Sequence, residues 1–417
     1  MTNVSLVDAA PPRKAGVLSE PNMRWYLGGQ LVSLTGTMLQ SAVLALLIVT
    51  ITSKAEAATW TGVVWALGLL PGTFFGPFAG ILLDRWDKRK VLMWCGAIGT
   101  LQALTLAYLT HTSHITLWQI NGLAFLMGFV NAIDGPGRNV IVKDAVADKR
   151  NVRQASKMFT SLYNLAQIAG PGFAGYLVIT FGYSFTFLLN ALSFVALIVA
   201  LANMKMAMRS PEAANGSGKV WTQVLEGGKY TFSEPGIRLC ILLTTGVCIF
   251  GFSYYLLLAV INKYMLHGNE VSYSHLAAAN GAGSFAGVFL AIALGERISH
   301  KTLIIAGMVL TGISLILLCW TTNTYLAMVD VFLAGAGFMA SFSSLRSSMI
   351  HIAKQEAAGV VLGYAFTFFY GGMMICAFLV GPLADHLGLP LVLGMSGAVL
   401  LVMAAATPFL PGINELE

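Results

Sequence analysis

A cluster of charged residues at positions 84–90 separates two long apolar stretches. Its side chains are close enough in sequence to interact electrostatically. The segment reads Asp-Arg-Trp-Asp-Lys-Arg-Lys, so six of its seven residues are charged. Charges at this density cannot lie in hydrocarbon, and the segment is expected to be a short polar hairpin between two membrane helices. Its acids and bases are suited to ion pairing between helices rather than to substrate binding.

A single acid, Asp330, lies near the start of another apolar stretch that reads Tyr-Leu-Ala-Met-Val-Asp-Val-Phe-Leu. A carboxylate inside the membrane is costly, and by default it is a functional candidate. Asp330 is therefore a candidate site for a proton or a cationic substrate. An equally weighted interpretation is an acid near the outer surface that water reaches or that a polar neighbour pairs.

Further polar side chains in apolar stretches could form hydrogen bonds to a ligand. These are Gln40, Asn121, Asn131, Tyr254 and Tyr255. Each such residue is more often an interhelical contact. The histidines and the five cysteines show no metal-like pairing, and the sequence contains no Walker motif. The sequence therefore predicts no cofactor, no metal and no ATP-driven pumping.

The composition requires a membrane to position these residues. Of the 417 residues, 57% are hydrophobic and only 10% are charged, whereas soluble domains carry about 25% charged residues. Apolar runs of about 20 residues match the thickness of a bilayer. The sequence thus predicts an all-α polytopic membrane protein with twelve spans, at 24–51, 60–83, 91–110, 115–135, 158–180, 184–204, 237–262, 274–295, 302–321, 324–345, 359–382 and 388–410.

Basic residues set the expected orientation. When both termini and the loops on their side are counted together, they hold 22 of the 24 Lys and Arg residues, which leaves Lys54 and Lys263 opposite. The positive-inside rule then places both termini in the cytoplasm. The net charge of +6 is a topology signal, and nucleic acid is not an expected partner.

A polar linker rich in Pro, Gly and Ser divides the chain into two halves with traces of an internal duplication. Gly175–Gly182 resembles Gly381–Gly388, and the charged hairpin has a counterpart at 295–301. Parallel halves with a site between them are a transporter architecture. The expected organisation is a cytoplasmic tail at 1–23, a six-helix bundle at 24–204, a cytoplasmic linker at 205–236, a second bundle at 237–410 and a tail at 411–417.

Within this organisation, two features are expected to shape helix packing. Residues 221–232 of the linker could form an amphipathic helix at the membrane surface. Glycine stripes in helix 2 (Gly68 to Gly80) and helix 8 (Gly283 to Gly295) predict close packing and a surface on which the halves could slide.

The hairpin pattern G-x-x-x-D-R-x-x-x-R-K resembles the signature loop of the major facilitator superfamily. It is met by Gly80, Asp84, Arg85, Arg89 and Lys90. Asp87 stands where that family usually has glycine. From about 24 to 410, the chain is similar to twelve-helix facilitators of the bacterial enterobactin and macrolide exporter group, and the resemblance implies two pseudo-symmetric six-helix bundles.

In that family the acid at the position of Asp84 faces the N-terminal end of helix 11, where unpaired amides carry a partial positive charge. The resemblance implies that Arg89 pairs with Asp84 and with an acid at the cytoplasmic end of helix 4, for which Asp134 is the candidate. These contacts would form a latch when the cytoplasmic side closes and would break when it opens.

A second resemblance lies in helix 5, where Gly-Pro-Gly-Phe-Ala-Gly at 170–175 is similar to the G-P-x-x-G-G pattern of efflux members. Pro171 removes one backbone hydrogen bond, so a bend is expected there. The resemblance implies that a kink formed by Gly170, Pro171 and Gly175 seals the halves against leakage.

The expected function is secondary active transport by alternating access, as a monomer in the inner membrane in contact with lipid. Export of an amphipathic drug or siderophore by proton antiport is the leading interpretation, although helix 1 carries no acid, unlike that of several drug–proton antiporters. Lysophospholipid flipping and import of a siderophore or metabolite are the alternatives. A membrane enzyme is not expected, because the membrane acids are not clustered at one depth. A sensor is not expected either, because no loop is long enough for an output domain.

Overall fold

A computed structural model describes residues 16–146, 149–205, 217–295, 297–355 and 357–416. It places the backbone but not the side chains of residues 76–85, 139, 143, 149, 217–224, 358, 414 and 416. The described chain is helical and contains no strand.

The first bundle contains α1 (Pro21–Ile51), α2 (Ala57–Arg85), α3 (Lys88–His111), α4 (Leu117–Ala145) and α5 (Val152–Asn203). The last of these is 52 residues long, whereas about 20 residues span a bilayer. Its backbone leaves the helical region at Gly182, where φ is +82°. This turn divides α5 into two membrane-length segments, so the bundle has six spans.

The second bundle is preceded by α6 (Ser217–Ser233). Its first span is interrupted and consists of α7 (Pro235–Gly251), α8 (Ser253–Leu256) and α9 (Leu258–Tyr264). The remaining spans are α10 (Glu270–Leu294), α11 (His300–Trp320), α12 (Thr324–Ile352), α13 (Ala358–Leu387) and α14 (Leu389–Ala406). Short 3-10 turns are η1 (Val17–Ser19), η2 (Lys149–Asn151), η3 (Thr407–Phe409) and η4 (Ile413–Leu416).

The predicted twelve-helix fold is confirmed. Within the described residues, ten helices are long and apolar enough to cross a membrane, and one of these is the double-length α5. The twelfth span is α4, which has 29 residues but a more polar composition. The membrane requirement therefore follows from the length and hydropathy of the helices alone.

Several helices are longer than predicted. The fourth span was expected to end at 135, yet α4 continues through Pro136 to Ala145. The tenth span was expected to end at 345, but α12 continues to Ile352 and includes Arg346. The last turns of these helices are polar, so hydropathy did not mark them.

The chain ends are also more ordered than the predicted tails. Val17 in η1 is buried with 1% of its surface exposed. In η4, Ile413 is buried, and the Glu415 carboxylate accepts a hydrogen bond from the Gly236 amide at 2.8 Å. Residues 1–15 and 417 of the predicted tails lie outside the described residues, as do residues 206–216 of the linker.

The predicted linker helix is confirmed as α6, although its predicted place at the membrane surface is not tested. Phe232 packs against the rings of Tyr364 and Phe368 of α13, with ring centroids 6.0 and 5.7 Å away. The hydroxyl of Tyr230 accepts a hydrogen bond from the Lys354 amide at 3.2 Å. The apolar side of α6 is thus joined to the second bundle.

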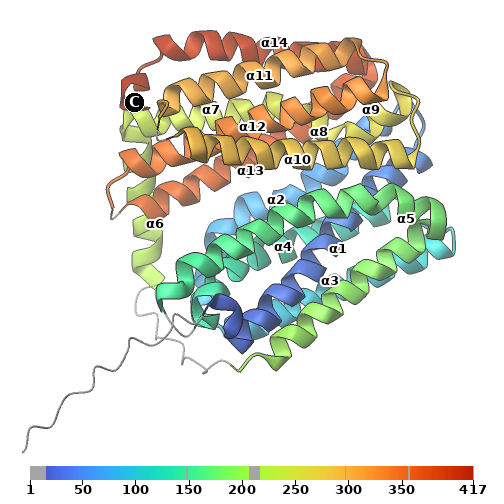
Figure 1. The fold of residues 1–417 in the computed structure, drawn as a ribbon, viewed down its shortest axis with the longest axis horizontal. Helices are drawn as coiled ribbons and strands as arrows, with labels where there is room; N and C mark the ends of the chain where they lie inside the picture. Colours follow the sequence, from blue (N-terminus) through green and yellow to red (C-terminus); the bar gives the residue numbers. More distant parts are fainter. Residues whose placement is uncertain (1–15, 147–148, 206–216, 296, 356, 417) are drawn as a thin grey trace, which may run out of the picture.

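The two bundles lie side by side (Figure 1). We call the end that carries the start of α1 and η4 the terminal end, and the opposite end, with the Gly182 and Gly388 turns, the distal end. In Figure 1 the bundles meet at the distal end, on the right, and their ribbons diverge toward the terminal end. The main contacts between bundles are α2 with α13 and α5 with α10.

The predicted internal duplication appears in equivalent local structures. Gly182 and Gly388 both have positive φ, +82° and +92°, and each turns the chain between consecutive spans. Asp87 caps the start of α3 and Ser299 caps the start of α11 through their side-chain oxygens. Side-chain caps satisfy amides that a helix start leaves unpaired, which explains why an acid is accommodated where the family usually has glycine.

Candidate functional site

The two bundles are joined at the distal end by Asp385, near the end of α13. Its carboxylate accepts hydrogen bonds from the backbone amides of Ala58 and Thr59, at 3.2 and 2.7 Å. These amides belong to the first turn of α2, which has no intrahelical acceptor for them and carries a partial positive charge. Asp385 therefore caps a helix of the opposite bundle.

Glycines allow the close approach that this cap requires. A Cβ added at Gly62 of α2 would collide with the Ala377 carbonyl, and one at Gly381 would lie 2.5 Å from the Ala58 carbonyl. Neither position can accept a side chain without moving the bundles apart. On the distal surface, a cleft of about 320 Å³ lies between them and is lined by Lys54, Ala384 and Asp385 among others.

The second contact between bundles repeats this arrangement in α5 and α10. A Cβ at Gly175 would collide with the Glu270 carbonyl. The Gly175 amide donates to the Ser274 hydroxyl at 2.5 Å, and the Tyr176 hydroxyl lies 2.6 Å from Nε2 of His275. Gly175 and Gly381, matched in the sequence, thus occupy equivalent places in the two contacts.

The helix-5 motif acts through close packing. Apart from Gly182, α5 retains helical backbone angles, including at Pro171. A Cβ at Gly170 would lie 2.7 Å from Cβ of Met38 in α1, whereas Gly175 faces the other bundle. The predicted kink is not a break in the helix, but Gly175 does lie at the seam between the halves.

Several glycines of the predicted sliding stripes pack within their own bundle, and Gly76 and Gly80 lie outside the residues whose side chains are described. Gly283 packs against the Phe332 carbonyl of α12 within the second bundle, and Gly128 of α4 packs against the Gly68 carbonyl within the first. The simpler interpretation of these stripes, passive packing, is the one that fits. Among the described glycines, those at which an added Cβ would come within 3 Å of the other bundle are Gly62, Gly175, Gly281 and Gly381.

Toward the terminal end the contacts between α2 and α13 weaken. A Cβ at Gly371 would lie 3.7 Å from the Thr73 methyl group, which is ordinary van der Waals contact. A Cβ at Gly72, Gly359 or Gly363 would have no described atom within 4 Å. Among the residues whose side chains are described, the close approaches of α2 to α13 therefore lie toward the distal end, and the ribbons of the two bundles diverge toward the terminal end (Figure 1).

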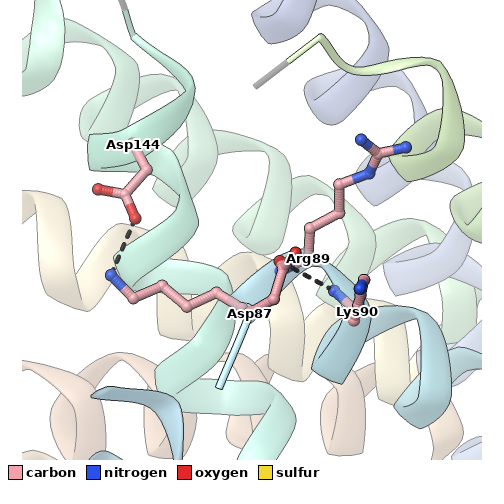
Figure 2. A network of polar contacts seen from close by, with 5 residues as sticks. Asp87, Arg89, Lys90 and Asp144 are labelled. Atoms are coloured by element: carbon pink, nitrogen blue, oxygen red, sulfur yellow. Dashed lines mark hydrogen bonds and ion pairs between the residues drawn. The ribbon is translucent and has the colours of Figure 1, made fainter. Parts of the chain in front are cut away.

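The charged hairpin forms contacts inside the first bundle (Figure 2). The Asp87 carboxylate accepts hydrogen bonds from the amides of Arg89 and Lys90 at 3.0 and 3.3 Å. Lys88 forms an ion pair of 2.9 Å with Asp144 in the last turn of α4. Asp144 was missed in the sequence because the fourth helix was expected to end before it.

Arg89 binds backbone rather than an acid. Its guanidinium donates to the carbonyls of Met204 at 2.9 Å and Ala202 at 2.6 Å, at the end of α5. The last carbonyls of a helix lack intrahelical donors and carry a partial negative charge. Arg89 thus connects the start of α3 to the end of α5.

The predicted pair between Arg89 and Asp134 is not formed in this structure. Asp134 instead forms an ion pair of 2.5 Å with Arg138, one turn further along α4, and both side chains are more than 90% buried. A buried arginine needs a counter-charge, and Asp134 is the acid within reach. The latch side chains at Gly80, Asp84 and Arg85 lie outside the described residues.

Gln40 belongs to a hydrogen-bond network within the first bundle. Its amide nitrogen donates to Oε1 of Gln102 at 3.0 Å, and its oxygen accepts from Asn190 at 2.9 Å. Asn190 also accepts from Ser193 at 2.9 Å. Gln40 is 6% exposed, so its amide holds three helices together and does not face the space between the bundles.

The two asparagines of α4 differ. Asn121 is 3% exposed, and neither atom of its amide has a hydrogen-bond partner among the described residues. Asn131 is exposed. A buried amide without partners is destabilising, so Asn121 remains a candidate for a partner that this conformation does not supply.

The adjacent tyrosines in α8 face in different directions. The Tyr254 hydroxyl donates to the Asn280 side chain at 2.6 Å, inside the second bundle. The Tyr255 ring packs edge-on against Trp65 of α2, with centroids 5.9 Å apart. Of this pair, Tyr255 therefore lies between the bundles.

Asp330 lies against the turn between α11 and α12. Its carboxylate accepts a hydrogen bond from the Thr321 hydroxyl at 2.8 Å, and the residue is 8% exposed. This local partner agrees with the structural interpretation of Asp330. The residue lies within one bundle rather than at the seam.

The sequence contained one unused signal for the distal contact. Asp385 is part of the duplicated segment Gly381–Gly388, where the first half has Ile179 in its place. A charged residue that breaks a repeat inside an apolar stretch is a functional candidate.

The chain matches a family model described as "Transmembrane secretion effector" over residues 16–415. It is 22% identical to macrolide efflux protein A of Streptococcus pyogenes over 392 residues, which are 93% of this chain and 96% of that protein. It is 28% identical to the staphyloferrin A transporter of Staphylococcus aureus over 160 residues, 38% of this chain and 40% of that protein.

Among solved structures, the chain resembles a bacterial homologue of the human lysosomal transporter Spinster in an inward-facing, unoccupied conformation. The TM-score is 0.73 at 15% identity, with 95% of this chain and 98% of that chain covered. The twelve-helix arrangement and the family match, which covers nearly the full length of the chain, indicate the same fold. The chain belongs to the transmembrane secretion effector family of the major facilitator superfamily and is a membrane transport protein rather than an enzyme.

Proposed function

We propose that this protein is a secondary active exporter of an amphipathic small molecule, a drug or a siderophore, that works by alternating access. The observation that carries the proposal is the asymmetry of the two bundles, which Asp385 joins at the distal end and whose ribbons diverge toward the terminal end (Figure 1). The similarity to a macrolide efflux protein and to a siderophore transporter supports this substrate class.

The orientation is part of the proposal. The basic residues favour a cytoplasmic terminal end, so this conformation would be inward-facing, as in the Spinster homologue. The protein would act as a monomer in the inner membrane. Fusion of a reporter that is active only in the cytoplasm to Glu417 would test the cytoplasmic location of the terminal end. An inactive fusion with normal expression would contradict that orientation.

The cycle would exchange one helix cap for another. With the distal end closed, Asp385 caps α2. With the terminal end closed, the hairpin acid Asp84 at the end of α2 would cap the start of α13, as the family resemblance implies. The two acids lie at opposite ends of the same helix pair, so only one cap would form at a time.

Export is tested in a deletion strain exposed to a drug panel and assayed for siderophore secretion, with wild-type complementation. Restored resistance or secretion is expected. If neither phenotype depends on the gene, uptake assays with siderophores and flipping of labelled lysophospholipid in proteoliposomes decide between the two alternatives.

Proton coupling is the finer part of the proposal, and Asp330 is its test. An asparagine at this position can still accept the hydrogen bond from Thr321. If the residue is structural, Asp330→Asn should retain gradient-driven transport within about twofold, whereas Asp330→Leu should lower stability because it leaves a buried hydroxyl less well paired. Loss of proton-driven transport in Asp330→Asn, with normal folding, would assign the proton or cation to this residue.

A further inference from the structure

Arg346 is a cation within a membrane-spanning helix that has no acidic partner. It lies six residues before the end of α12, and its side chain is exposed. Its guanidinium carbon lies 5.3 Å from the centre of the Phe366 ring in α13, within the range of a cation–π contact. The described residues provide it with no ion pair. An arginine at such a place is a functional candidate by default.

The internal repeat provides a comparison for Arg346 in the first bundle. Arg138 of α4 is the counterpart of Arg346, and Asp134, four residues earlier, neutralises it. Four residues before Arg346 the second half has Phe342. The same element thus carries a neutralised arginine in one bundle and an arginine beside an aromatic ring in the other.

A second polar group without a partner lies beside Arg346. Thr244 of α7 lines a narrow cleft of the second bundle together with Phe342, Arg346 and Phe366, and in this structure the cleft is too narrow to hold a water molecule. Thr244 is 1% exposed, and its hydroxyl has no hydrogen-bond partner in the part of the chain that the structure describes. The next residue, Thr245, does what helix threonines commonly do and donates to the Ile241 carbonyl at 2.9 Å. A buried hydroxyl without a partner is unfavourable unless a ligand pairs with it.

An aromatic face of α13 continues from the cleft. Phe366 stacks with Tyr370 one turn further along α13, with centroids 6.4 Å apart. Both rings are 39% exposed. A ligand that reaches Arg346 therefore has an apolar surface beside it.

We propose that this cleft widens when its side chains move apart and then binds the anionic group of an amphipathic ligand. The Arg346 guanidinium would pair with a carboxylate, sulfonate or phosphate, for which its planar donor geometry is suited. The Thr244 hydroxyl would donate a second hydrogen bond, and Phe342 and Phe366 would contact the apolar body of the ligand. This inference rests on the proposed transport function and assigns a charge to its substrate.

The test compares two dyes that differ in one group. 8-Anilinonaphthalene-1-sulfonate is an amphipathic anion, and N-phenyl-1-naphthylamine is its uncharged counterpart. Their fluorescence is titrated with the full chain in phosphatidylcholine nanodiscs, corrected for empty nanodiscs. We expect Arg346→Gln to weaken binding of the anion by about tenfold or more and binding of the neutral dye by less than twofold, because a charge-assisted hydrogen bond is lost.

Three further variants guard against a folding defect and a general charge effect. Arg346→Lys and Thr244→Val should each weaken anion binding and leave the neutral dye unchanged. Arg238→Gln removes an exposed charge at the start of α7 outside the cleft and should bind both dyes like wild type. Unchanged anion binding in Arg346→Gln and Thr244→Val, or an equal loss in Arg238→Gln, would overturn the proposal.

A change of lipid composition distinguishes a lipid phosphate from a soluble anion as the natural ligand of the cleft. Replacement of part of the phosphatidylcholine with phosphatidylglycerol should displace the anionic dye only if a lipid phosphate occupies the site, and Arg346 should be required for the displacement. Without displacement, the natural ligand is a soluble anion. Dye binding does not depend on transport, so failure of the export assays and failure of this site are distinguishable.

Discussion

At the scale of single residues, Asp385 joins the two bundles through backbone amides rather than through another side chain. A carboxylate on two amides of a helix start combines hydrogen bonding with the helix dipole. Such a contact depends little on the side chains of α2, and it is lost once the helix end moves away. This suits a contact that must form and break in every cycle.

Asp385→Asn should weaken the distal cap by about 1 kcal/mol, or about fivefold in the ratio of closed to open states, because the charge on the helix start is lost. Increased labelling of Ala384→Cys by a maleimide that cannot cross membranes would report the shift. The assay requires replacement of Cys319, the native cysteine that is not buried.

Glu56→Gln is the matched control for that experiment, because Glu56 is an exposed acid at the same end whose described contact is with Trp60 of its own helix. It should label like the parent protein. Equal labelling of the Asp385 and Glu56 variants would mean that the cap does not hold the distal end closed.

Asp87 illustrates how a departure from a family pattern can have a local cause. Its side chain caps α3, and replacement of such a cap by alanine costs about 1 kcal/mol, whereas replacement by glycine costs only a few tenths. Asp87→Ala should therefore reduce resistance to unfolding in detergent, and Asp87→Gly should be close to wild type. Equal destabilisation by both would argue against capping.

At the scale of elements, two helix pairs form the seam, α2 with α13 and α5 with α10. Each pair meets at glycines that face backbone carbonyls of the other bundle. The interrupted span α7–α9 brings Tyr255 to Trp65 beside this seam. Gly283 and Gly287 thus allow close packing within the second bundle, whereas the glycines of the two seam pairs allow close packing between the bundles.

Methyl groups at the seam should block closure of the distal end. Gly175→Ala and Gly381→Ala each place a Cβ against a carbonyl oxygen, so we expect transport to fall at least tenfold with normal membrane insertion. Gly72→Ala and Gly363→Ala add the same methyl where it meets no described atom and should retain transport of the same substrate. Wild-type activity of the seam variants would show that the distal contact is looser than described.

At the scale of the whole molecule, closure at one end and separation at the other are linked by the rigidity of the bundles. If the bundles rock as units, the equilibrium between the two states is shared by both ends. A change at the distal cap then has a consequence at the terminal end, across the length of α13.

Asp385→Asn should thus have opposite effects at the two ends. Labelling of Gly363→Cys from the terminal side should fall as labelling of Ala384→Cys from the distal side rises, by the same factor. The measurement compares initial labelling rates in right-side-out and inverted vesicles. A change confined to the distal end would indicate local fraying instead of alternating access.

The sequence by itself determined the number of spans, the two halves and the charged hairpin, because hydropathy, charge and repeat spacing act locally along the chain. It also determined most candidate residues, but not their partners. Gln40 and Arg89 bind groups of their own bundle, and Asp330 binds Thr321 across a turn. Only packing could decide this, because a polar side chain in a helix has several directions open to it.

The distal contact was decided by the tertiary structure alone. Asp385 and Thr59 are separated by 326 positions, and nothing local marks the first amides of α2 as the site that an acid of another bundle will cap. The same holds for Thr244 and Arg346, which one cleft brings together from different helices. Apolar pattern fixes which segments enter the membrane, while close packing of glycines and the need to pair buried polar groups fix which of them meet.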